Sequence, residues 1–182
     1  MGAQGQEVSC LIRTNAGMCA LWQPEAFAHI RDFDTWEDQV AEDSALVPHI
    51  ANGVFVPINI GGDGVFQSVV RLDEAADALS ERETPYLVVS SEEYLLRSNG
   101  AVLIGGLEDV GEIGSTESVE IPVAAGRYRV RVNMIDWKAD PNSVDAFGKA
   151  SAEALPDFII QIAREISHDA AYRVNVETFD RP

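Results

Sequence analysis

Residues 126–136, GRYRVRVNMID, alternate apolar and charged side chains, and this stretch decides the fold. In an extended chain, successive side chains point to opposite faces. One face of this stretch collects the apolar side chains of Tyr128, Val130, Val132 and Met134. The other face collects Arg127, Arg129 and Arg131. The pattern predicts a strand with one face in the core and the other in water.

The same alternation, broken by Gly, Pro and Asn, recurs along the chain and predicts a row of strands. Candidate strands lie at residues 8–14, 17–22, 53–60, 64–72, 84–91, 101–107, 157–164 and 172–179. We expect the first two to form a hairpin. The third and fourth should form another around the turn GGDG, where glycines permit positive φ. Residues 156–170 are also long enough for a helix, and that alternative stays open.

Helical signals are short and lie outside the predicted strands. Candidate helices cover residues 24–30, 34–41 and 73–80. In the second, Asp34 is a candidate N-cap with Glu37 three residues on, and Trp36 and Val40 are spaced to face inward. We therefore predict a mainly β fold: an antiparallel β-sandwich or a bent sheet with a few short peripheral helices.

Composition limits the domain organisation and the partners. A chain of 182 residues with 46% hydrophobic residues predicts a single domain, residues 1–182. Thirty acidic and thirteen basic residues give a net charge of −17, which disfavours nucleic acids and anionic membranes. No apolar run approaches the ~20 residues of a membrane span, so we expect a cytoplasmic protein. Without a secretory signal, Cys10 and Cys19 are expected to be reduced and buried.

Two acidic segments are the candidate binding surface for a basic protein partner. The stretch RDFDTWEDQVAED, residues 31–43, surrounds Trp36 with six carboxylates: Asp32, Asp34, Glu37, Asp38, Glu42 and Asp43. Residues 107–120 contain five acids and no base, and we expect a mobile loop there. The candidate binding residues of that loop are Glu108, Asp109 and Glu112. The competing interpretation is a solvated acidic face that only keeps the protein in solution.

The sequence contains no pattern typical of a metal site, a cofactor site or a catalytic site. A calcium loop starting at Asp32 would need an oxygen ligand at its fifth position and Gly at its sixth, where Trp36 and Glu37 stand. The histidines, at positions 29, 49 and 168, lack the spacing of a zinc site. GGDG precedes a predicted strand rather than a helix, unlike a phosphate-binding loop. We therefore predict no metal, no cofactor and no catalytic residues.

The order of segments from about Val65 to Trp137 resembles the competence protein J family of small acidic bacterial nuclease inhibitors. The stretches that carry the resemblance are GVFQSVVRL, ETPYLVV and ESVEIPVAAGRYRVRVNMIDW. The last is similar to the family's strand, proline–glycine turn and tyrosine-bearing strand. The acidic N-terminal region and the insertion at residues 73–83 depart from the family. The resemblance implies a non-catalytic protein that neutralises a nuclease or toxin by covering its active cleft.

The leading hypothesis is thus a cytoplasmic, non-enzymatic inhibitor- or immunity-type protein with a basic protein partner, suspected to be a nuclease or toxin. The alternative is a β-sandwich domain that binds a small ligand or serves as a structural subunit. An enzyme without a recognisable motif is the third hypothesis. These residues leave the partner's identity and the oligomeric state open.

Overall fold

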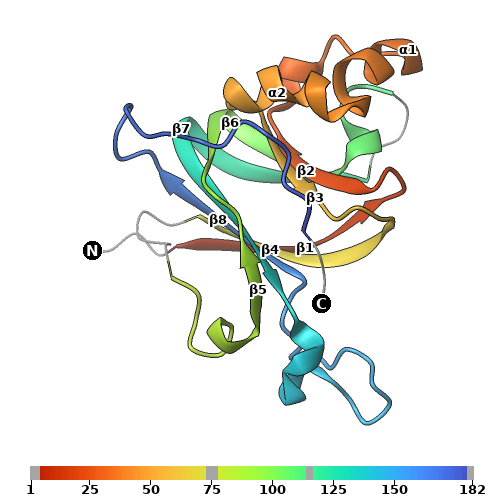
Figure 1. The fold of residues 1–182 in the computed structure, drawn as a ribbon, viewed down its shortest axis with the longest axis vertical. Helices are drawn as coiled ribbons and strands as arrows, with labels where there is room; N and C mark the ends of the chain where they lie inside the picture. The colour runs from red at the N-terminus through yellow and green to blue at the C-terminus, as the bar shows by residue number, and fades with distance from the viewer. Residues whose placement is uncertain (1–4, 73–77, 114–116, 180–182) are drawn as a thin grey trace.

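The chain folds around one curved β-sheet (Figure 1). The computed structural model describes residues 5–72, 78–113 and 117–179. The strands are β1 (Gln6–Thr14), β2 (Met18–Trp22), β3 (Phe55–Asn59), β4 (Gly64–Leu72), β5 (Leu87–Ser90), β6 (Tyr94–Gly106), β7 (Val119–Ile135) and β8 (Phe158–Arg164). The helices are α1 (Phe33–Trp36), a π-helical turn (Glu37–Ala41) and α2 (Asp43–Ala51). Short 3₁₀ turns cover Pro24–Phe27, Thr84–Tyr86, Leu107–Asp109, Trp137–Ala139 and Pro141–Ser143. The predicted mainly β class is confirmed.

The strand order is β1-β4-β8-β7-β6-β2-β3, and β5 pairs with β7 outside this path. All neighbours are antiparallel except β4 and β8, which are parallel, so the sheet is mixed. The alternating residues 126–135 lie in the centre of the sheet, where Val130 is in register with Tyr94 on one side and Ile162 on the other. Of the two predicted architectures, the bent sheet is the observed one.

Both predicted hairpins are wrong. β1 pairs with β4, and β2 pairs with β3. The chain bends at residues 15–17 between β1 and β2, and at 60–63 between β3 and β4. The two bends lie opposite each other, since the Gly61 N–H donates to the Gly17 carbonyl at 3.0 Å. Both glycines have positive φ, so they let a long two-stranded ribbon bend instead of reversing each strand.

The C-terminal part of the chain corrects two further expectations. Residues 158–164 are strand β8, so the predicted strand is confirmed and the helical alternative for 156–170 is excluded. Residues 172–179 do not form the predicted strand, and their only β-type pairing is an isolated bridge between Thr178 and Asn59. The expected proline–glycine turn is also absent, because β7 continues through Pro122 and Gly126. The predicted helix at 73–80 lies largely outside the described residues.

The apolar face of β7 is buried, as predicted: Tyr128, Val130, Val132 and Met134 belong to the main core. The arginine face is only partly exposed, which corrects the expectation of a wet face: the Arg127 and Arg131 side chains are each 37% exposed. The Arg129 side chain is only 13% exposed and pairs with Glu93 at 2.9 Å. The segment after β8 meets this face at two points: Glu165 accepts a hydrogen bond from Arg127 at 2.6 Å, and the Arg173 N–H donates to the Glu93 carbonyl at 2.9 Å. Cys10 and Cys19 are buried, also as predicted.

Two regions mark the ends of the long axis of the molecule (Figure 1). The helices α1 and α2 lie at one end. At the other end, residues 79–90 and 136–157 form a small distal lobe. The distal lobe has its own apolar cluster, made by Ile135, Leu155 and Ile159 with Leu79, Tyr86 and Trp137 packed against it. In the part of the chain that the structure describes, no helix is both long and apolar enough to cross a membrane.

Candidate functional site

The acidic segment 32–43 is a chain of short helical turns that begins at Asp32. Asp32 has extended backbone angles, and its Oδ1 accepts a hydrogen bond from the Thr35 N–H at 2.8 Å. The N–H and the hydroxyl of Thr35 hold the pKa of Asp32 below its ordinary value. The helix cap is therefore Asp32 and not Asp34, which lies in the first turn of α1, so the predicted capping box with Glu37 is wrong.

Trp36 and Val40 attach this segment to the sheet, as their spacing predicted. Val40 is fully buried. Trp36 is half-buried against the core, and its Nε1–H donates to the Leu107 carbonyl at 3.0 Å. Phe33 stacks on Trp36 with 5.7 Å between the ring centroids, yet remains 61% exposed. The acidic segment thus carries an aromatic pair that is anchored on one side and open on the other.

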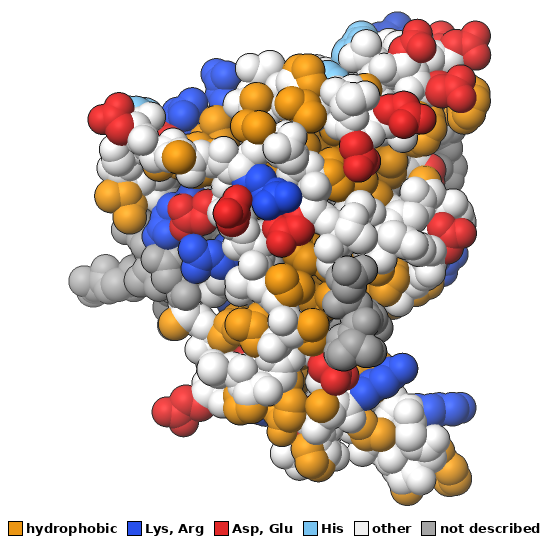
Figure 2. Space-filling view, in the orientation of Figure 1, with side chains coloured by type: hydrophobic (Ala, Val, Ile, Leu, Met, Phe, Trp, Pro, Cys, Tyr) orange, Lys and Arg blue, Asp and Glu red, His pale blue; other side chains and the backbone are white. Residues whose placement is uncertain are grey.

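The structure brings the two predicted acidic segments together, although about seventy residues separate them in the sequence. Besides the Trp36–Leu107 hydrogen bond, the Glu112 N–H donates to the Ile30 carbonyl at 2.7 Å. The Arg31 Nε lies 3.7 Å from a Glu112 carboxylate oxygen. We call the combined surface, residues 32–43 and 108–112, the acidic cap. Figure 2 shows acidic side chains gathered at this end of the molecule.

The predicted binding residues fall into two groups within the acidic cap. The exposed acids are Asp32, Asp34, Glu37, Asp38, Glu42, Asp43 and Glu112. Glu108 and Asp109 are half-buried. Glu108 accepts hydrogen bonds from the Thr14 hydroxyl at 2.9 Å and the Asn15 N–H at 2.6 Å, so it holds the bend after β1. Burial, followed by the nearby charges of Glu108 and Glu117, raises the pKa of Asp109.

Residues 107–113 form a packed turn, in contrast to the mobile loop expected for 107–120. Leu107 and Val110 are buried. Gly111 has a φ of +100°, and a Cβ placed there would lie 2.7 Å from a methyl carbon of Ile30. This close approach fixes the turn against the start of the acidic segment. Residues 114–116 lie outside the described part of the chain.

The chemistry of the acidic cap is that of charge display. Six exposed carboxylates lie within twelve residues, and the neighbouring base, Arg31, is itself close to Glu112. Carboxylates of this kind attract Lys and Arg side chains over several ångströms and form short hydrogen bonds on contact. Sequence reasoning missed Phe33 as a member of this surface. An aromatic residue between two aspartates was the signal that could have identified it.

Both cysteines are buried, and two of the histidines, His49 and His168, contact other side chains. Burial raises the pKa of Cys10, and burial together with Glu108 and Asp109 raises the pKa of Cys19 to about 12. The His49 ring packs on Phe27 with centroids 4.9 Å apart, and burial lowers the pKa of His49. His168 contacts Glu165 at 3.0 Å. Across the described ranges, no three His, Cys, Asp or Glu side chains form a group suited to a metal ion.

Comparison with known proteins gives structural similarity only. No family model matches the sequence, and no curated protein matches it significantly. The structure is similar to "Crocagin biosynthetic gene J" with a TM-score of 0.63 and 17% identity, covering 90% of this chain and 99% of that chain. It is also similar to ComJ from Bacillus subtilis, described as an inhibitor of the DNA degrading activity of NucA. That match has a TM-score of 0.48 and 10% identity and covers 91% of this chain and 98% of that chain. The first similarity identifies the fold, and the weak resemblance to competence protein J seen in the sequence is also present in the structure.

Proposed function

We propose that this protein is a non-enzymatic, acidic binding protein of the inhibitor or immunity type, which covers the basic cleft of a nuclease or toxin with its acidic cap. The observation that carries the proposal is the position of the six exposed carboxylates of residues 32–43. They occupy one end of the molecule, beside an exposed aromatic ring.

The proposed partner class follows from charge and shape. A nuclease cleft is lined by Lys and Arg because it must bind phosphates. An inhibitor can occupy such a cleft by presenting carboxylates where phosphates would lie, and the opposite charges accelerate association. Binding also needs a desolvated centre, which aromatic residues commonly provide. Phe33, stacked on the anchored Trp36, is placed to be that centre.

The non-enzymatic part of the proposal is supported by the state of the reactive groups. A catalytic thiol needs a lowered pKa, whereas the pKa values of both cysteines are raised. The buried carboxylates Glu83 and Asp140 pair with Arg71 and Arg82 at 2.6 and 2.7 Å. Burial alone would raise the pKa of either carboxyl, but the hydrogen bonds to the ionised form outweigh it and lower both values. Such carboxylates stay ionised and serve the fold.

The test begins by identifying the partner through the acidic cap. A photo-cross-linking amino acid at position 38, which is exposed, is used in extract from the native organism, and cross-linked proteins are identified by mass spectrometry. We expect a basic nuclease or toxin. The purified partner is then assayed for its own activity with and without this protein, and we expect inhibition at equimolar protein.

Two charge variants separate the acidic cap from net charge. The cap variant carries E37Q, D38N, E42Q and D43N. The matched control carries E81Q, E120Q, E153Q and D169N, four exposed acids outside the cap. Both change the net charge from −17 to −13, since each removes four negative charges.

We expect the cap variant to slow association with the partner by ~10-fold or more, with an unchanged melting temperature. The control should associate nearly as fast as the wild type. Equal slowing of both variants would mean that the effect comes from the net charge of the protein and not from the acidic cap. No slowing of either would leave the cap as a solvated face and end the proposal.

A further inference from the structure

The distal lobe ends in a tight turn that holds Phe147 out of the molecule. Phe147 is 88% exposed, although it is a large apolar side chain. One carboxylate oxygen of Asp145 accepts hydrogen bonds from the Phe147 N–H at 2.8 Å and the Lys149 N–H at 2.9 Å. The Asp145 N–H donates to the Lys149 carbonyl at 2.8 Å, and Gly148 takes a φ of +76°. The turn is closed by these bonds, so the ring is presented in a defined position.

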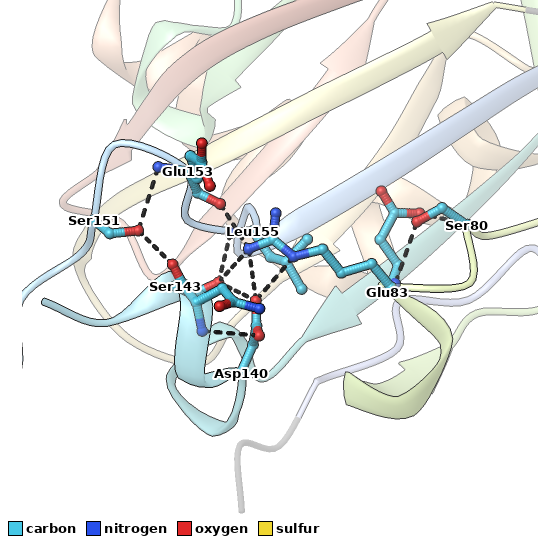
Figure 3. A network of polar contacts seen from close by, with 9 residues as sticks. Ser80, Glu83, Asp140, Ser143, Ser151, Glu153 and Leu155 are labelled. Atoms are coloured by element: carbon cyan, nitrogen blue, oxygen red, sulfur yellow. Dashed lines mark hydrogen bonds and ion pairs between the residues drawn. The ribbon is translucent and has the colours of Figure 1, made fainter.

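A buried polar network fixes the base of this turn (Figure 3). The Arg82 guanidinium donates to Asp140 at 2.7 Å and to the Glu153 carbonyl at 2.7 Å. The Ser143 hydroxyl donates to the same Asp140 oxygen at 2.7 Å and accepts the Leu155 N–H at 2.8 Å. Asp140 and Ser143 are 1% and 0% exposed. The network ties both ends of the segment that carries Phe147 to Arg82. The fold of the lobe therefore keeps Phe147 exposed.

A hollow of about 500 Å³ lies beside the turn, between the β1–β4 pair and residues 150–157. Its apolar walls include Leu11, Val65 and Val69 from the strands, and Ala150, Leu155 and Pro156 from the lobe. Leu11 and Val65 are 61% and 50% exposed. The Asp157 carboxylate, which also lines the hollow, accepts hydrogen bonds from the Gln67 N–H at 2.9 Å and the Trp137 Nε1–H at 3.0 Å. The hollow thus offers exposed apolar walls and an acid that is already engaged.

We propose that this hollow receives Phe147 of a second copy of the chain, so that the distal lobes of two molecules form a two-fold symmetric dimer. A two-fold interface uses the same patch on both subunits, and that patch must be complementary to itself. Here an apolar projection adjoins the hollow, since the bridge between Val144 and Ala150 joins the turn to the wall of the hollow. The hollow is of mixed character: besides its apolar walls, Ser9, Gln67 and Ser151 line it. The volume is sufficient, because a cavity of about 150 Å³ holds a benzene ring.

Charge opposes contact less at this end than at the other, because the distal lobe has seven acids and three bases, whereas the acidic cap has nine acids and no base. The acidic cap lies at the opposite end of the long axis (Figure 1), so the strongest negative charges stay far apart in such a dimer. The chain has only two lysines, Lys138 and Lys149, and both belong to the distal lobe. Figure 2 shows basic and hydrophobic side chains together at this end. The dimer presents two acidic caps that point away from each other, a bivalent arrangement.

The experiment is sedimentation equilibrium of the full chain at concentrations up to about 200 µM, the range in which weak dimers are detected. We expect a mass that rises from monomer to dimer. Phe147→Ala and Leu11→Asp should each raise the dissociation constant at least tenfold, because they remove the projection and spoil the hollow respectively. Phe33→Ala, at the opposite end and 61% exposed, is the matched control and should leave the dissociation constant unchanged. Circular dichroism and the urea midpoint check that each variant is folded.

Mixing the two variants tests the reciprocal geometry. The Phe147→Ala chain keeps an intact hollow, and the Leu11→Asp chain keeps an intact projection. The mixture should therefore form a heterodimer, with one of the two contacts restored, at concentrations where each variant alone is monomeric.

Three results would overturn the proposal. One is a wild-type chain that stays monomeric at about 200 µM. Another is a dimer indifferent to Phe147→Ala. The third is a monomer that binds neutral phosphatidylcholine vesicles through Phe147, which would make the ring a lipid contact. None of these results affects the proposal for the acidic cap, because that proposal is tested by inhibition of the partner.

Discussion

Trp36 connects the two halves of the acidic cap, so its replacement tests whether the cap is a built surface or a loose acidic segment. The indole is half-buried, donates to the Leu107 carbonyl at 3.0 Å and supports the exposed ring of Phe33. Trp36→Ala removes all three contacts. Trp36→Phe keeps a ring for packing and stacking, and loses only the hydrogen-bond donor.

The magnitude follows from the burial of the side chain and from its hydrogen bond. Truncating a fully buried Trp costs about 3–5 kcal/mol, so half burial predicts roughly 2 kcal/mol for Trp36→Ala. The lost hydrogen bond adds about 1 kcal/mol. We expect a decrease in the free energy of unfolding of about 3 kcal/mol for Trp36→Ala and about 1 kcal/mol for Trp36→Phe. Phe33→Ala, on the exposed side of the stack, should cost less than about 1 kcal/mol.

The assay is urea unfolding followed by far-ultraviolet circular dichroism, since removing a tryptophan changes the fluorescence itself. The slope of free energy against urea should be the same for all variants, so that midpoints report stability. A Trp36→Ala protein within about 0.5 kcal/mol of wild type would refute the anchoring role. Equal losses for Trp36→Ala and Phe33→Ala would refute the distinction between the anchored and the open ring.

Three further predictions follow from the core, the buried acids and the acidic segment. Val130→Asp should destabilise the fold by several kcal/mol because Val130 is fully buried. Arg129→Ser should cost only about 1–2 kcal/mol, because the Glu93 carboxylate is 26% exposed and still pairs with Arg131. Equal losses in urea unfolding would contradict the difference between the two faces of β7. The lowered pKa values of Glu83 and Asp140 stabilise the fold above their ordinary values of 4.5 and 3.8, so this stability should disappear as pH falls through the lower folded-state values. A urea midpoint independent of pH between about 5 and 2 would contradict that sign. Chelation should leave the melting temperature unchanged, and a rise of several degrees on adding calcium would make residues 32–43 a metal loop.

Most strands could be predicted from the sequence, whereas their pairing could not. The alternation in residues 126–136 identified the buried face of β7, and the same signal predicted a strand at β8 while leaving a helix there open. It failed for residues 172–179, where the chain alternates apolar and polar residues but runs as an irregular segment against the main core: Phe179 is buried there, and the Asn175 carbonyl accepts a hydrogen bond from the Tyr94 hydroxyl at 2.9 Å. Both hairpins failed because a glycine with positive φ is equally compatible with a reversal and with a bend. Whether the chain reverses or bends at such a glycine depends on the strands with which the two-stranded ribbon pairs in the rest of the sheet.

The sequence by itself determined the class of fold, the buried face of β7 and the acidity of residues 32–43, because each is a property of neighbouring residues in the chain. Only the tertiary structure decided that Glu108 is used to hold a bend and that residues 108–112 join the acidic segment. The physical reason is that these outcomes depend on contacts between distant segments. The local sequence pattern determines the face of a strand or helix on which a side chain lies, but the packing of the whole chain determines which residues that side chain contacts.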